Sequence, residues 1–114
     1  MEIRRIVLAA DDVPAMVAFH NAVFACELRP LDGADGFHLG TFCGIELLIC
    51  PNSIAEVDAR QNRHQFRVAV DDLVAAVAAV ERHGGHRLDD ADPSTADVVG
   101  IADPEGNTYE LTAS

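Results

Sequence analysis

The chain has 114 residues and a net charge of −11, from 19 acidic and 8 basic residues. Its length suits one domain with a modest core, and 49% hydrophobic residues are typical of a folded globular protein. The acidity argues against binding to nucleic acid or to anionic membranes, because their phosphates attract basic surfaces. All the basic residues are arginine, so chemistry that needs a lysine nucleophile is excluded.

The cysteines Cys26, Cys43 and Cys50 are odd in number and lack the spacing of a metal site. We therefore expect no disulfide framework and a cytoplasmic location. No apolar run reaches the roughly 18 residues that a membrane helix needs. The first residues lead directly into a strand pattern, so we expect no signal peptide.

Residues 3–10 predict a strand. Asp11 and Asp12 follow it and are typical of a helix N-terminus, where free N–H groups and the helix dipole favour carboxylates. Pro14 fits the first turn, and apolar residues at helical spacing continue the helix to Phe24.

Two further strands are expected at residues 37–42 and 45–50, after a turn at 33–36 and with a bend at 43–44. Residues 51–62 are polar, and we expect them to form an irregular connection.

The same order then recurs. Residues 65–70 predict a strand, and Asp72 begins a helix that runs to about His83 before Gly84 ends it. Strands at 98–102 and 107–112 are expected on either side of an Asp-Pro-Glu-Gly turn.

The two copies align without a gap at a separation of 60 residues, so that Ala9 matches Ala69 and Asp12 matches Asp72. This repeat predicts one domain, residues 1–114, made of two similar modules at 1–58 and 59–114. In this alignment Arg5 corresponds to Gln65.

The repeated order of strand, Asp-Asp, helix and three strands resembles the vicinal oxygen chelate superfamily, which includes glyoxalase I, bleomycin-resistance proteins and extradiol dioxygenases. The segment Asp103-Pro-Glu-Gly-Asn-Thr-Tyr-Glu-Leu111 resembles the C-terminal signature of that superfamily. The resemblance covers essentially the whole chain and implies an α+β fold: two βαβββ modules whose curved mixed sheets enclose a cavity for a small molecule. It also implies a homodimer, and a symmetric partner would cover the free sheet edges of so short a chain.

Strand alternation separates the residues that pack on a helix from those on the opposite face of the sheet. Phe66, Val68 and Val70 form the expected helix side of the 65–70 strand. If the opposite face of each strand lines the cavity, a ligand can contact Arg5, Glu46, Leu48, Cys50, Gln65, Arg67 and Glu110.

Metal-dependent members of the superfamily carry a His or Gln, Glu, His, Glu ligand set. The resemblance places its first, third and fourth positions on Arg5, Gln65 and Glu110, and its second on Glu46 or Leu48. Arginine stays protonated and cannot coordinate a metal, so this set makes a poor transition-metal site. We therefore expect no metal and no other cofactor, with Arg5 paired to Glu110 or Glu46.

His64 is an alternative ligand, because a register shift of one residue would bring it into the cavity. The same shift would move Val68 and its neighbours to the wrong face. The remaining histidines show no ligand spacing; they are His20, His38, His83 and His86. Cys50 is the one thiol expected in the cavity and has no evident His partner in the sequence.

Two functions remain open. The first is a binding protein that holds a small organic molecule without metal, like bleomycin-resistance proteins. The alternative is a metal-dependent lyase, isomerase or dioxygenase of the same superfamily. An enzyme without metal could use Glu110 as a general base and Arg5 to stabilise an oxyanion. The sequence does not decide whether the chain catalyses a reaction.

Overall fold

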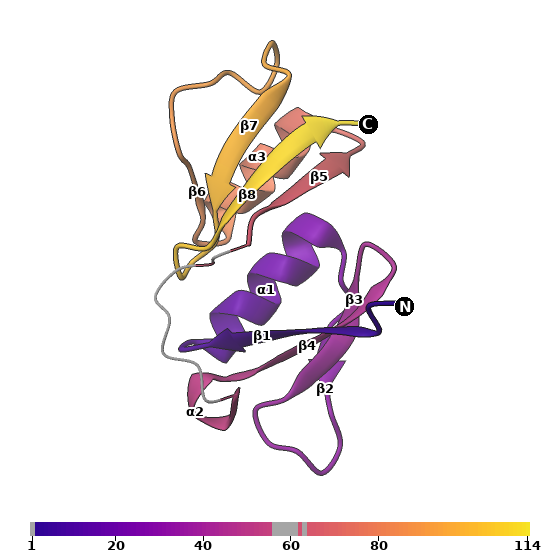
Figure 1. The fold of residues 1–114 in the computed structure, drawn as a ribbon. Coiled ribbons are helices and arrows are strands. Elements are labelled where there is room, and N and C mark those ends of the chain that lie inside the picture. Colours follow the sequence, from indigo (N-terminus) through magenta and orange to yellow (C-terminus); the bar gives the residue numbers. More distant parts are fainter. Residues whose placement is uncertain (1, 56–61, 63) are drawn as a thin grey trace. The chain divides into compact units, whose positions relative to one another are not determined.

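The computed structural model describes residues 2–55, 62 and 64–114. The chain divides into two compact units, Met1–Asp58 and Ala59–Ser114 (Figure 1). Each unit contains a four-stranded mixed sheet and a helix that contacts it, so the expected α+β fold of two βαβββ modules is confirmed.

Unit 1 has the strand order β1-β4-β3-β2, in which β1 runs parallel to β4 and the other neighbours are antiparallel. A second, short helix follows β4 and contacts both β4 and β1. In chain order, its elements are β1 (Arg5–Ala10), α1 (Val13–Phe24), β2 (Arg29–Pro30), β3 (His38–Phe42), β4 (Ile45–Pro51) and α2 (Asn52–Ala55).

Unit 2 repeats this topology with the order β5-β8-β7-β6, in which β5 runs parallel to β8. Its helix contacts the three strands β6, β7 and β8 (Figure 1). In chain order, its elements are β5 (Phe66–Val70), α3 (Leu73–Arg82), β6 (His86–Arg87), β7 (Val98–Ala102) and β8 (Thr108–Ala113).

The two long helices begin as the sequence predicts. The Asp12 carboxylate accepts the N–H of Ala15 at 3.1 Å, and the Asp72 carboxylate accepts the N–H of Ala75 at 3.0 Å. Each bond satisfies one of the N–H groups that have no partner within the helix. The repeated Asp-Asp sequence is therefore a pair of matched helix caps.

Strand alternation assigns the two faces of each sheet as expected. In unit 1, Leu47 and Ile49 are buried on the side of α1, but Leu48 and Cys50 on the opposite face of β4 are buried as well. In unit 2, Val99, Ile101 and Leu111 are fully buried. The opposite face of each sheet, turned away from its helix, is called the far face below. Phe66 is a partial correction: it begins an edge strand and remains 41% exposed, although it was expected to pack on the helix.

The segment after α1 passes very close to β3. The Asn21 side chain holds it by donating to the carbonyl of Leu28 at 3.2 Å and accepting the N–H of Leu28 at 2.7 Å. The N–H of Thr41 donates to the carbonyl of Cys26 at 2.9 Å. Gly40 lies under this crossing, where a Cβ atom would be 2.3 Å from the Cys26 carbonyl oxygen.

In unit 2 the turn between β7 and β8 is built around one buried carboxylate. Asp103 is 1% exposed and accepts hydrogen bonds from the N–H groups of Glu105 and Asn107. It also accepts from the Asn107 side chain and from the Tyr109 hydroxyl. The C-terminal signature therefore encodes a turn that fixes where β8 begins.

One expectation about local structure was wrong. Residues 52–55 form α2 within the segment that we expected to be irregular, and residues 56–61 of that segment lie outside the described residues. The family resemblance implied a third strand after each helix, but the residue pattern did not locate these strands, which are the short β2 and β6. Two residues are too few to show the alternation of a strand in the sequence. These strands form because they pair with β3 and β7.

Candidate functional site

Arg5 and Glu46 face each other on the far face of unit 1. The register of β1 and β4 makes them direct neighbours, with Arg5 Nε 3.0 Å from Glu46 Oε2 and Arg5 Nη2 3.2 Å from Glu46 Oε1. This is a two-point ion pair between planar groups, a geometry in which both nitrogens and both oxygens are engaged. Of the two partners that the sequence left open for Arg5, the structure pairs it with Glu46.

This pairing stabilises the charged forms of both groups. The hydrogen bond from Arg5 lowers the pKa of Glu46, and the same hydrogen bond raises the pKa of Arg5. Glu46 therefore remains a carboxylate to lower pH than an isolated glutamate. An Arg5 guanidinium already bound in this way is a poor candidate for stabilising an oxyanion.

We expect the contribution of Glu46 to stability to disappear in acid. Because its pKa is lower in the folded than in the unfolded protein, the stabilisation is present above the unfolded pKa and is lost as the pH falls through the folded pKa. Unfolding free energies of the parent and of Glu46→Gln, measured from neutral to acid pH, should therefore converge at the acid end.

The Arg5→Gln variant is the matched control for this prediction. It should return the pKa of Glu46, followed by NMR of the carboxyl carbon, toward the ordinary glutamate value. A Glu46 pKa that is unchanged in Arg5→Gln would show that the ion pair does not form in solution.

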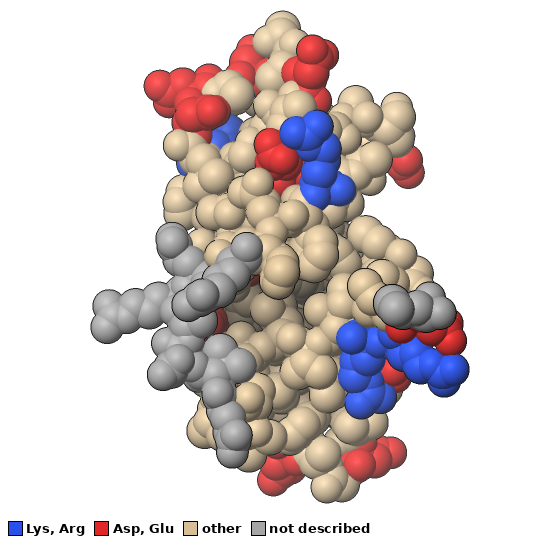
Figure 2. All heavy atoms as spheres, in the orientation of Figure 1, with Lys and Arg blue, Asp and Glu red and all other residues tan. Residues whose placement is uncertain are grey.

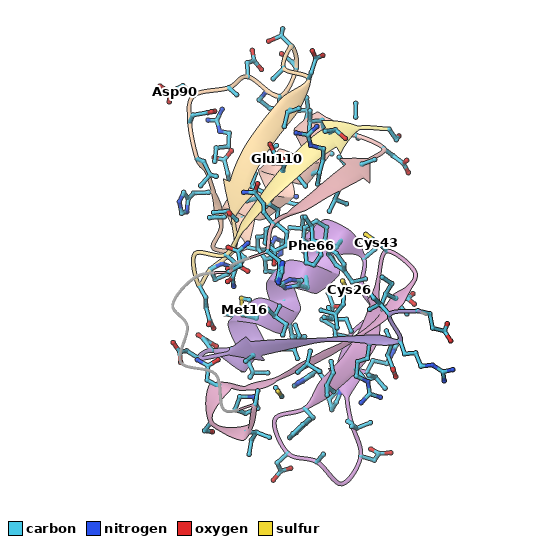
Figure 3. The ribbon with its side chains drawn as sticks, viewed as in Figure 1. Met16, Cys26, Cys43, Phe66, Asp90 and Glu110 are labelled. Atoms are coloured by element: carbon cyan, nitrogen blue, oxygen red, sulfur yellow. The ribbon has the colours of Figure 1, made fainter. Side chains whose placement is uncertain are left out.

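Unit 2 places a second arginine–glutamate pair on its far face, in which both nitrogens donate to one carboxylate oxygen. Arg67 lies opposite Glu110, and its Nε and Nη2 are 3.2 Å and 3.1 Å from Glu110 Oε1. Glu110 projects from β8, the central strand next to β5 (Figure 3). The general-base candidate Glu110 is therefore held by an arginine from its own module.

Gln65 is also engaged within unit 2. Its Nε2 donates to the Thr108 hydroxyl at 2.8 Å. The Asn62 side chain holds the same threonine, because it accepts the Thr108 N–H at 2.9 Å and donates to the Thr108 carbonyl at 3.1 Å. Gln65 and Thr108 thus form a second polar pair on this face, separate from Arg67–Glu110, and Thr108 was not among the sequence candidates.

The strand registers show which residue of unit 1 corresponds to Glu110. Val7 and Arg67 are 60 positions apart and match in the repeat. Val7 lies opposite Leu48, and Arg67 lies opposite Glu110. Leu48, not Glu46, therefore occupies the position of unit 1 that matches Glu110 in unit 2.

The thiols are held in their neutral form. Cys50 is on the far face of unit 1 but is only 2% exposed, and burial raises its pKa. Burial raises the pKa of Cys26 to about 12, and partial desolvation raises the pKa of Cys43, an exposed residue in the turn between β3 and β4 (Figure 3). A nucleophile needs the thiolate, so these positions do not favour cysteine catalysis.

His20 has a structural role, and His64 does not reach the far face. His20 is buried, with Nδ1 2.8 Å from the Met16 carbonyl, and packs in an aromatic cluster with Phe19 and Phe42. His64 is exposed and precedes β5, and the register of β5 leaves Val68 buried and Arg67 on the far face. Within the described residues, no group of three or more His, Cys, Asp or Glu is arranged to hold a metal ion.

Sequence reasoning missed Arg29 on the far face of unit 1. Arg29 is the first residue of β2 and lies opposite Leu39, which in turn lies opposite Leu48. Directly opposed residues share a face, so Arg29 joins the far face at its β2 edge. No signal in the sequence could place it, since β2 has only two residues.

The comparisons with known proteins agree with this architecture. Each half of the chain has one long helix and a sheet whose first and last strands in sequence pair in parallel, which defines a protein of paired βαβββ modules. A profile of the glyoxalase-like domain family matches residues 5–112. The chain belongs to this family, and with it to the vicinal oxygen chelate superfamily.

Solved structures of low sequence identity share the fold. A glyoxalase/bleomycin resistance protein/dioxygenase family enzyme from Burkholderia phytofirmans PsJN aligns with a TM-score of 0.73 at 14% identity, covering 99% of this chain and 98% of that one. The fosfomycin resistance protein FosX from Listeria monocytogenes aligns with a TM-score of 0.72 at 13% identity, covering 100% and 91%. A glyoxalase-related enzyme from Fulvimarina pelagi aligns with a TM-score of 0.72 at 18% identity, covering 99% and 88%.

A search of curated proteins finds no matching sequence. Among the described residues, no helix is both long enough and apolar enough to cross a membrane.

Proposed function

We propose that this protein binds a small organic ligand on the far faces of its sheets and does so without a resident metal. The observation that carries the proposal is the pair of ion pairs on these faces. Glu46 and Glu110, the carboxylates that the superfamily resemblance offers to a metal, are each bound to an arginine of the same module.

The chemistry of these residues does not fit a transition metal. The guanidinium bound to each carboxylate would remain beside any cation that the carboxylate coordinated, and its positive charge would repel that cation. Leu48, at the position that matches Glu110, has no donor atom, and the Gln65 amide is used by Thr108. The same surfaces suit an organic molecule, because they combine apolar side chains with a few polar groups.

A thermal-shift screen of small organic acids, amines and neutral compounds tests the proposal. At least one compound should raise the melting temperature, because a ligand at 100 times its dissociation constant stabilises the folded state by about 2.7 kcal/mol. The shift should survive prior treatment with a chelator, and elemental analysis should find well under one transition metal per chain. A shift seen only with bound metal would instead support the metal-dependent enzyme.

Matched variants locate the binding surface. Val7, on the far face of unit 1, and Val74, on α3, are 52% and 49% exposed, so each tolerates a charge to a similar degree. Val7→Asp should reduce the ligand-induced shift and Val74→Asp should leave it unchanged. If the two variants change the ligand-induced shift equally, the ligand does not bind on the far face of unit 1.

A further inference from the structure

A single row of side chains crosses the far face of unit 1 from one edge of the sheet to the other. The registers of the four strands align its members directly. From β1 through β4 and β3 to β2, they are Val7, Leu48, Leu39 and Arg29. The row is apolar along most of its length and ends in a cation.

The arginine at the end of this row differs from the other arginines of the two far faces. Arg5 and Arg67 are bound to Glu46 and Glu110, so their charges are already compensated. Arg29 is exposed and, within the described residues, forms no ion pair. Basic and acidic side chains lie next to each other elsewhere on the molecule (Figure 2). Arg29 therefore offers a guanidinium that a ligand can engage without displacing a carboxylate.

Arg29 borders a recess, and hydrogen bonds fix the backbone that precedes it. At the β2 edge, where α1 ends, a recess of about 410 Å³ open to the surface is lined by Arg29 together with Asn21, Ala25, Glu27 and Leu28; the three apolar residues of the row do not line it. Ala25 and Glu27 have φ angles of +51° and +54°, in the left-handed region, which turns the chain sharply before β2. The two hydrogen bonds between Asn21 and Leu28 fix the backbone immediately before Arg29.

The corresponding row of unit 2 has the opposite arrangement. It runs from Arg67 through Glu110 and Gly100 to Leu88, whose N–H donates to the Gly100 carbonyl at 2.9 Å. An apolar residue thus stands where unit 1 has Arg29, and a compensated ion pair stands where unit 1 has Val7 and Leu48. Only the row of unit 1 joins an apolar surface to an uncompensated cation.

We propose that the far face of unit 1 binds an organic monocarboxylate with an apolar body. Its carboxylate pairs with Arg29 and its apolar part packs on Leu39 and Val7, which lie on either side of Leu48; Leu48 itself is only 8% exposed. A guanidinium recognises a planar carboxylate through two parallel hydrogen bonds. The net charge of −11 and the Glu27 carboxylate in the same recess disfavour ligands with several negative charges.

This inference rests on the proposed function and narrows its ligand to a chemical class. Titration calorimetry with octanoate and with octanamide, which has the same apolar chain without the charge, distinguishes the carboxylate class from ligand binding in general. Octanoate should bind to the parent protein about tenfold more tightly than octanamide, since a hydrogen-bonded charge contributes more than a neutral group.

Two variants of the recess should have opposite effects. Arg29→Gln should weaken octanoate binding about tenfold and leave octanamide binding unchanged. Glu27→Gln should strengthen octanoate binding, because it removes a like charge from the recess. Arg82→Gln is the control: Arg82 is an exposed arginine in the last turn of α3 in unit 2, and its loss should change neither affinity.

The outcomes are distinct. Equal affinity for octanoate and octanamide, both lost in Val7→Asp, would overturn the carboxylate class and leave the proposed binding function standing. If Arg29→Gln and Arg82→Gln weaken octanoate binding equally, the effect is one of overall charge, and the assignment to Arg29 is overturned. If neither compound binds and the wider screen yields no ligand, both proposals fail.

Discussion

Replacing Gly40 with alanine is expected to destabilise the protein by about 3 kcal/mol or more, because backbone atoms block the new methyl group. The added Cβ would lie 2.3 Å from the carbonyl oxygen of Cys26 and 3.0 Å from the backbone of Leu28. Neither atom belongs to a flexible side chain, and the Asn21 hydrogen bonds hold Leu28 in place. The strand β3 and the segment that leads to Arg29 would have to separate.

Gly100→Ala is the matched control for Gly40→Ala. Gly100 lies in β7, the strand of unit 2 that corresponds to β3, and the three atoms nearest to its Cβ would all belong to the side chain of Leu88, the first at 3.1 Å. That side chain is half-exposed and can move. We expect Gly100→Ala to remain within about 1 kcal/mol of the parent, because alanine also loses less backbone entropy on folding than glycine.

Chemical denaturation followed by circular dichroism measures both variants. The chain has no tryptophan and one tyrosine, so fluorescence is a poor probe of unit 1. Similar unfolding free energies for Gly40→Ala and Gly100→Ala would contradict the close crossing of Cys26 over β3.

Asp103→Ala is expected to cost about 3 kcal/mol, because it removes the acceptor for four hydrogen bonds in a buried turn. The N–H groups of Glu105 and Asn107, at 2.9 Å and 3.0 Å, would lose their shared partner. The Tyr109 hydroxyl, at 3.1 Å, would lose its acceptor inside the core of unit 2. Since the turn sets the start of β8, the position of Glu110 opposite Arg67 should loosen as well.

Graded variants distinguish this network from a general effect of removing charge. Tyr109→Phe removes one of the four bonds and should cost about 1 kcal/mol. Asp97→Ala removes an exposed acidic residue of the preceding loop and should change stability by no more than about 0.5 kcal/mol. An Asp103→Ala protein as stable as Asp97→Ala would show that the carboxylate does not organise the turn.

Much of the fold could be predicted because its signals are local. The carboxylates of Asp12 and Asp72 mark helix starts through bonds to residues three positions on. Alternation assigned Val68 to the helix side and Arg67 to the far face, and the register of β5 with β8 agrees. The repeat added support, because the strand and helix pattern of one module predicted the same order in the other.

The candidate site was only partly predictable. The sequence placed Glu46, Leu48 and Glu110 on the far faces but could not say which of the first two matches the third. That answer depends on the lengths of the connections between strands, which set the register of β4 against β1. The sequence also left two partners open for Arg5, because the strand register, and not the residue type, decides which residues pair across strands.

By itself, the sequence determined the α+β class, the two modules, the helix caps and the side of the sheet on which most strand residues lie. These follow from short-range hydrogen bonds and from the two-residue period of a strand. Tertiary structure alone decided the ion pairs Arg5–Glu46 and Arg67–Glu110 and the place of Arg29. Arg29 reaches the far face because the chain crosses Gly40 and then pairs with β3 for only two residues. Contacts between segments so far apart in the chain produce no periodic pattern in the sequence.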